Sequence, residues 1–118
     1  IVSSQTADWD QEKAYRVFQN VLTAHPNVKG VFGASDLMAV GAIQAIEAAN
    51  KTGQIKVIGF DYHESAQAAI SEGTMVGSVA QYPAEMGAKA IEIAIGKLTN
   101  PDFTTDAEVY TTVELLTD

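Results

Sequence analysis

The sequence predicts an α/β fold, a doubly wound parallel sheet with helices on both faces. Short apolar runs of strand type alternate with amphipathic helical stretches along the whole chain, an order that calls for parallel strands joined by right-handed crossovers. With 118 residues, 47% of them hydrophobic, the chain can bury a core. Sequence repeats, low-complexity segments and Gly/Ser linkers are absent, so composition alone does not divide the chain.

The first elements are the end of a strand and a helix. Residues 1–4 (IVSS) are typical of a strand end, and Asp8 precedes a helical stretch that Trp9 opens and Pro26 ends. The apolar positions of this stretch recur at helical spacing: Ala14, Val17, Phe18, Val21 and Leu22.

The next pair is a strand at residues 28–34 (VKGVFGA) and a helix from Asp36 to Ala49, with Asp36 interpreted as the helix cap. One face of that helix carries Met38, Ala42, Ile43, Ile46 and Ala49.

After Gly53, residues 55–60 predict a further strand, followed by a short helix over residues 65–72 that Gly73 stops. Residues 75–80 predict the following strand.

Pro83 suits the first turn of a helix that runs to about Leu98, and Asn100-Pro101 breaks it. The closing strand has one wetter face, because Val109, Thr111, Val113 and Leu115 alternate with Glu108, Tyr110, Thr112 and Glu114.

Charge argues against nucleic-acid and anionic-membrane partners. The formal net charge is −8, and the seven basic residues are dispersed along the chain. The chain has no cysteine, which excludes disulfides and thiolate-bound zinc. No run resembles a signal peptide or a membrane span.

Nucleotide, hydrolytic and metal sites lack their usual motifs. The glycines of VFGASD and VIGFD do not form the GxGxxG or GxxxxGK[ST] loops that cradle phosphates, and no G-x-S-x-G elbow supplies a nucleophile. Asp61, His63 and Glu64 are a possible metal cluster, but adjacent loop residues without a distant partner rarely close a site. We therefore expect no enzyme activity, no metal and no other cofactor.

Asp61 is the main functional candidate from position alone. It follows the apolar run Val57-Ile58-Gly59-Phe60, and ligands are held at the carboxyl ends of strands in α/β sheets. A turn or cap residue is the alternative interpretation.

Four stretches resemble, in order and spacing, the carboxyl-terminal part of ribose-type sugar-binding proteins that serve bacterial ABC importers. They are QTADWDQEKAYRVFQNVLTAHPNVKGVF, GASDLMAVGAIQAIEAA, KVIGFD and GSVAQYPAEMGAKAIE. Related sugar-responsive repressors share versions of DLMAVGA and GFD, whereas VAQYPAEMG is more similar to the transport proteins.

The resemblance implies a ring-stacking aromatic at Trp9, a polar ligand contact at Ser35, a hydroxyl acceptor at Asp61 and an amide contact at Gln81. The chemistry fits, because a sugar offers a C–H face for an indole and hydroxyls that need directed partners. Ser35 departs from the family pattern, which usually has asparagine before the aspartate matched by Asp36, so the identity of the sugar is open.

The resemblance also implies two lobes joined by a hinge, with the upstream lobe missing from this chain. Residues 1–81 would belong to the carboxyl-terminal lobe, residues 82–107 would cross the hinge and pack with the other lobe, and residues 108–118 would return as a strand. Without the missing segment, the chain is expected to be sticky or paired, because one face of the helix over residues 84–98 stays exposed: Met86, Ala90, Ile91 and Leu98.

The function implied first is an extracytoplasmic solute-binding protein that captures a monosaccharide between its lobes and delivers it to an ABC importer. Its partners would be the permease or a chemoreceptor, and its location the periplasm or a membrane-anchored lipoprotein. The sugar-sensing domain of a repressor is the second interpretation. A phosphorelay receiver domain is a distant third, because receiver domains carry an acidic pair directly after the first strand, whereas Asp8 and Asp10 stand several residues later.

Overall fold

The computed structural model describes residues 1–117 and divides the chain into two compact units. The first unit is Ile1–Ala80 together with the chain from Leu115 on, and the second is Gln81–Glu114. No helix of the described residues is long and apolar enough to cross a membrane.

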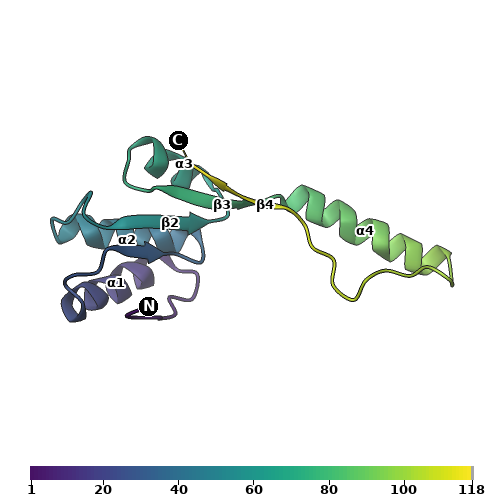
Figure 1. The fold of residues 1–118 in the computed structure, drawn as a ribbon, viewed down its shortest axis with the longest axis horizontal. Coiled ribbons are helices and arrows are strands. Elements are labelled where there is room, and N and C mark those ends of the chain that lie inside the picture. Colours follow the sequence, from purple (N-terminus) through teal and green to yellow (C-terminus); the bar gives the residue numbers. More distant parts are fainter. Residues whose placement is uncertain (118) are drawn as a thin grey trace. The chain divides into compact units, whose positions relative to one another are not determined.

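The first unit alternates helices and strands in the predicted order (Figure 1). Its elements are α1 (Gln11–Ala24), β1 (Gly30–Phe32), α2 (Asp36–Ala48), β2 (Lys56–Phe60), α3 (Glu64–Ser71), β3 (Gly77–Gln81) and β4 (Val113–Leu116), with the ends of β3 and β4 reaching into the second unit. The α/β class with parallel neighbouring strands is confirmed.

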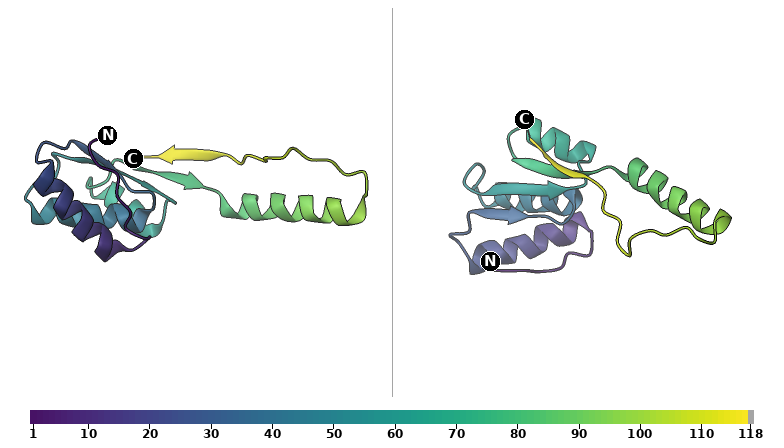
Figure 2. Two further views of the ribbon diagram at one scale, coloured as in Figure 1. Left: turned by 90° about the horizontal axis from the view of Figure 1, so that it is seen from below. Right: turned by 45° about the vertical axis from the view of Figure 1, so that its right-hand side comes forward.

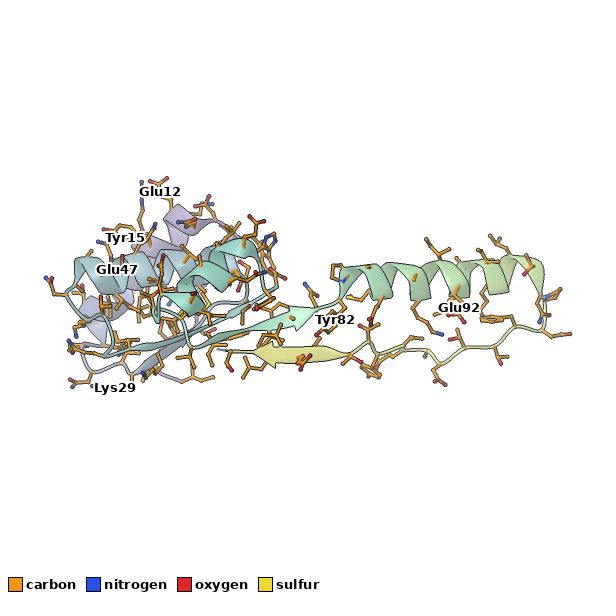
Figure 3. All side chains as sticks on the ribbon, turned by 90° about the horizontal axis from the view of Figure 1, so that it is seen from above. Glu12, Tyr15, Lys29, Glu47, Tyr82 and Glu92 are labelled. Atoms are coloured by element: carbon orange, nitrogen blue, oxygen red, sulfur yellow. The ribbon has the colours of Figure 1, made fainter. Side chains whose placement is uncertain are left out.

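The sheet has the strand order β1-β2-β3-β4. The first three strands are parallel, with Phe32 opposite Ile58 and Phe60 opposite Val79, whereas β4 runs in the opposite direction to β3 (Figure 2). Successive right-handed crossovers that step in one direction place their helices on one face of a sheet. Accordingly, α2 and α3 lie on the same face (Figure 3).

Burial along β2 alternates with the pleat. Val57 and Gly59 are buried, whereas Ile58 and Phe60 are only half-buried. The core on the helical side joins three helices to β2 through a cluster of apolar side chains: Phe18, Leu22, Ala39, Ala42, Ile43, Ala45, Ile46, Ile55, Val57, Ala66, Ala69, Ile70 and Met75. These residues give the sheet a rigid platform for the loops at its edge.

Two expectations about the start of the chain are wrong. Residues 1–4 form no strand but run as extended coil, and Val2 stays exposed. Trp9 does not open α1, because the cap is Asp10, whose carboxylate accepts a 2.7 Å hydrogen bond from the backbone N–H of Lys13.

The predicted cap of α2 is also wrong by one residue. Ser35 has extended backbone (φ −150°, ψ 160°), and its Oγ accepts a 3.3 Å hydrogen bond from the Met38 N–H. Asp36 is the first helical residue, and its side chain turns into the protein, where it is completely buried.

The second unit contains α4 (Pro83–Thr99), followed by an extended segment. The ring of Phe103 from that segment lies against Gly96 of α4, and the Lys97 ammonium donates to the carbonyl oxygen of Phe103 at 3.0 Å. Tyr82 and Glu114, near the two ends of the unit, are joined by a 2.8 Å hydrogen bond from the phenol to the carboxylate. No residue of α4 is buried, and β4 begins at Val113, later than the sequence pattern predicts.

Candidate ligand-binding edge of the sheet

The carboxyl ends of β1, β2 and β3 meet at one edge of the sheet. Their register aligns Phe32 with Ile58 and Phe60 with Val79, so the residues that follow each strand emerge side by side. Ser35 comes three residues after β1, Asp61 directly after β2, and Gln81 is the last residue of β3. Three of the four predicted ligand residues therefore stand at strand ends, where α/β sheets hold ligands.

Asp61 stands in a backbone conformation that disfavours ordinary side chains. Its φ is +106°, and that of the next residue, Tyr62, is +59°. Both angles lie in the region that normally belongs to glycine, and such strain persists only when the surroundings hold it. Asp61 is half-buried, so its carboxylate stays within reach of a ligand.

The turn before α1 repeats this feature at Trp9. Asp8 has a φ of +51° and Trp9 a φ of +62°. Of the five described non-glycine residues with positive φ, four are thus the pairs 8–9 and 61–62 that contain candidate ligand residues. Because backbone strain clusters at binding sites, this pattern is independent support for both positions.

Trp9 is 67% exposed and does not fill the core. Figure 1 shows the turn that carries it, in purple, at the end of the unit toward which the β1 and β2 arrows point. The turn is tied together by Asp8, whose carboxylate accepts hydrogen bonds from Thr6 Oγ1 and from Lys13 Nζ, both at 3.0 Å. The Lys13 hydrogen bond, aided by that from Thr6, holds the pKa of Asp8 below its ordinary value, so this carboxylate is ionised at neutral pH.

Ser35 is almost fully buried, with 5% of its surface exposed. Its oxygen already accepts the capping hydrogen bond, which leaves the hydroxyl proton as the group it could offer to a ligand.

A buried polar cluster beneath Asp61 was missed by the sequence reasoning. Asp36 is fully buried; its Oδ1 accepts a 2.7 Å hydrogen bond from Ser78 Oγ and its Oδ2 a 2.6 Å hydrogen bond from the His63 N–H. The Ser78 oxygen in turn accepts a 3.1 Å hydrogen bond from the Tyr62 N–H. The only sequence feature that points to this cluster is Asp36 at the start of an apolar helix. A helix cap at the surface explains that feature equally well.

Gly59 makes room for this cluster. A Cβ atom built on Gly59 would lie 2.2 Å from Asp36 Oδ1, far inside contact distance. The glycine of KVIGFD therefore serves a close approach between the strand and a buried carboxylate, not a turn.

Asp61, His63 and Glu64 do not form a metal site. Among the described residues, no group of three or more His, Cys, Asp or Glu side chains could hold a metal ion. The His63 and Glu64 side chains are exposed at the start of α3.

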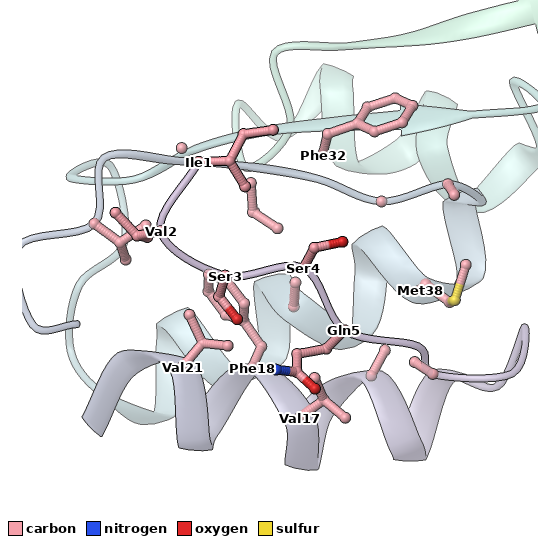
Figure 4. A pocket seen from close by; sticks show the side chains of 18 residues that line it. Ile1, Val2, Ser3, Ser4, Gln5, Val17, Phe18, Val21, Phe32 and Met38 are labelled. Carbon is pink, nitrogen blue, oxygen red and sulfur yellow. The ribbon is translucent and has the colours of Figure 1, made fainter. Parts of the chain in front are cut away.

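A pocket of about 460 Å³ lies between the first residues of the chain, α1 and β1 (Figure 4). Val17 and Val21 of α1 line it together with Phe32, and its polar groups come from Ser3, Ser4 and Gln5. None of the four predicted ligand residues lines this pocket, whereas Phe32, Gly33 and Ala34 at the carboxyl end of β1 do.

A model of the periplasmic binding protein domain matches residues 1–102. The chain belongs to the periplasmic binding protein domain family. This membership confirms the resemblance stated from the sequence.

Curated relatives are sugar-binding members of the family. The ribose import binding protein of Salmonella typhimurium is 42% identical over 94 residues, which cover 80% of this chain and 31% of that protein. The D-ribose/D-allose-binding protein of Pseudomonas aeruginosa is 34% identical over 119 residues, covering 99% of this chain and 37% of that protein. The chain therefore spans about a third of the length of these periplasmic binding proteins.

Solved structures of the family share the fold. A periplasmic solute-binding protein of an ABC transporter from Actinobacillus succinogenes, with bound D-allose, is 35% identical with a TM-score of 0.86, and the match covers 99% of this chain and 41% of that one. The myo-inositol-binding protein of Caulobacter is 33% identical with a TM-score of 0.86, and the match covers 99% of this chain and 40% of that one.

Proposed function

We propose that this chain is part of an extracytoplasmic solute-binding protein that captures a monosaccharide and delivers it to an ABC importer. The observation that carries the proposal is Asp61, an accessible carboxylate held on a strained loop at the carboxyl edge of the sheet. An ionised aspartate can accept two sugar hydroxyls in charge-assisted hydrogen bonds, each worth about 1.5–3 kcal/mol.

The other proposed contacts supply what a carboxylate lacks. The exposed indole of Trp9 offers an apolar face for the C–H side of a sugar ring, and Gln81 offers both a donor and an acceptor. Ser35 would add one hydroxyl donor. Together these groups match a small, uncharged polyhydroxylated ligand.

The names of the relatives favour transport over repression. One curated match described above is a ribose import binding protein and the other a D-ribose/D-allose-binding protein, and the solved structures hold D-allose and myo-inositol. We accordingly propose a periplasmic location, or a membrane-anchored lipoprotein form, with an ABC permease as the partner. Fractionation of cells that express the complete protein tests the location, and a cytosolic pool alone would overturn it.

The proposal is tested by thermal unfolding of the complete protein with a panel of pentoses, hexoses and cyclic polyols, and with amino acids as the control class. A ligand that binds only the folded state raises the melting temperature as its concentration rises. When the ligand concentration is one hundred times Kd, the free energy of unfolding increases by about 2.7 kcal/mol. We expect a saturable increase with at least one sugar or polyol. No shift across the panel, or a shift with amino acids alone, would contradict the proposal.

A further inference from the structure

The loop that carries Asp61 is fastened to the protein at three consecutive backbone N–H groups. Asp61 donates to the carbonyl oxygen of Val79 at 2.9 Å, Tyr62 to Ser78 Oγ at 3.1 Å, and His63 to Asp36 Oδ2 at 2.6 Å. The first of these bonds continues the sheet, but the other two end on buried side chains. Ordinary turns need no such pair of side-chain anchors.

The two anchors are one unit. The Ser78 hydroxyl donates to Asp36 Oδ1 at 2.7 Å while its oxygen accepts from Tyr62, so both carboxylate oxygens of Asp36 act on the same loop. Ser78 and Asp36 are fully buried, at 0% exposure each. A buried carboxylate that has no cationic hydrogen-bond partner is costly unless other donors satisfy it. The donors to Asp36 are the His63 N–H of the loop and the hydroxyl of Ser78, which also binds the loop.

Two of the three fastened residues have unfavourable backbone angles, whereas His63 has an ordinary φ of −67°. Asp61 and Tyr62 carry φ values of +106° and +59°, and neither is glycine. The Tyr62 ring packs against the core, which fixes the far side of the same residue. Without the anchors, the loop could relax to ordinary angles and the Asp61 carboxylate would point elsewhere.

We propose that Asp36 and Ser78 are positioning residues for ligand binding, which act on the ligand only through the orientation they impose on Asp61. This inference rests on the proposed function, because it assumes that Asp61 accepts hydrogen bonds from the sugar. Preorganisation of the carboxylate would then lower the entropic cost of binding.

The first test needs no ligand. Amide hydrogen exchange of Tyr62 and His63 should be slow in the wild-type chain, and Ser78→Ala should speed exchange at Tyr62 by about tenfold or more while the amides in the middle of α2 keep their protection. Thr74→Val is the matched control, since it removes a part-buried hydroxyl bond to the Ala69 carbonyl oxygen that lies outside the cluster. Unchanged protection at Tyr62 in Ser78→Ala would overturn the inference.

The second test is a double-mutant cycle in the complete protein, with binding of the sugar found in the thermal panel measured by calorimetry well below the melting temperature. Ser78→Ala should weaken binding about tenfold, the effect of about one hydrogen bond, whereas in the Asp61→Ala background it should change affinity less than twofold. Thr74→Val should leave affinity unchanged in both backgrounds. An equal loss in both backgrounds would show that Ser78 acts independently of Asp61 and would overturn the inference.

Asp36→Asn is the second variant if Ser78→Ala does not fold. The amide keeps an acceptor for His63 and can donate to Ser78, so the fold should persist while the charge-assisted bonds are lost. We expect several-fold weaker sugar binding, again only when Asp61 is present. A wild-type protein that binds no sugar refutes the proposed function instead, and the exchange experiment then still decides whether Asp36 and Ser78 hold the loop.

Discussion

The Trp9 side chain lies outside the hydrophobic core. It is a large apolar group that is 67% exposed, and a hydrogen-bonded turn holds it there with positive φ. Solvent exposure of an indole has no benefit for the unliganded fold. We expect a ligand to pack on the ring, which is the role predicted for Trp9.

Trp9→Ala should therefore weaken sugar binding of the complete protein by about 1–3 kcal/mol, mostly through lost apolar contact. The melting temperature without ligand should hardly change, because the ring is not part of the core. The emission of Trp9, the only tryptophan in the sequence, should change saturably with sugar if its binding buries the ring. A loss of about 3–5 kcal/mol in unliganded stability, with no sugar-dependent emission change at this residue, would show instead that Trp9 is structural.

Ser35 combines capping with a place at the candidate edge, and two substitutions separate these roles. Ser35→Ala removes the acceptor for the Met38 N–H and should lower the free energy of unfolding by about 1 kcal/mol. Ser35→Asn keeps a capping oxygen and adds an N–H donor, so stability should stay near wild type while the preference among the sugars that bind in the thermal panel changes. Denaturant unfolding and competition calorimetry measure the two effects. An unchanged sugar preference in Ser35→Asn would show that Ser35 caps α2 but does not contact the ligand.

Helices α1 and α2 approach each other closely at Gly41. A Cβ atom there would lie 2.3 Å from the carbonyl oxygen of Gln11 and 2.9 Å from the Ala14 side chain. The backbone oxygen cannot rotate away, so α1 itself would have to move.

Gly41→Ala should consequently destabilise the protein by about 1–3 kcal/mol through overpacking, which outweighs the gain of about 1 kcal/mol in helix propensity. Gly87→Ala in α4 is the matched control, because nothing lies within 4 Å of its added Cβ and only the favourable propensity remains. Chemical denaturation compares the two variants. Stabilisation by Gly41→Ala would contradict the close helix contact.

The order of the elements was predictable because hydrophobic spacing and breakers such as Pro26 and Gly73 act locally. The exact caps were not, since Ser35 and Asp36 are both good caps and only two distant donors, the buried Ser78 hydroxyl and the backbone N–H of His63, decide which one turns inward. Likewise, the pattern of residues 109–115 predicted a longer strand, but only Val113–Leu116 pairs with the sheet. Position at a strand end marked Asp61; the strain and the anchors beneath it depend on contacts 16 to 42 residues apart along the chain.

The whole chain spans about a third of the length of its curated relatives in the family. The net charge of −8 suits an uncharged ligand such as a sugar better than a phosphorylated one, because a negative surface repels anions. The roles of Trp9, Ser35, Asp61 and Gln81 remain predictions that only binding measurements on the complete protein can test.

The most direct measurement is calorimetric titration of the complete protein with the sugar identified in the thermal panel, for wild type and for Asp61→Ala. The substitution deletes a charge-assisted acceptor from a half-buried loop without emptying a core site, so the variant should fold as the wild type does. We expect its affinity to fall by about 2 kcal/mol or more, roughly 30-fold. Unchanged affinity in a folded variant, or a variant that does not fold, would show that Asp61 is a structural turn residue and not a ligand for the sugar.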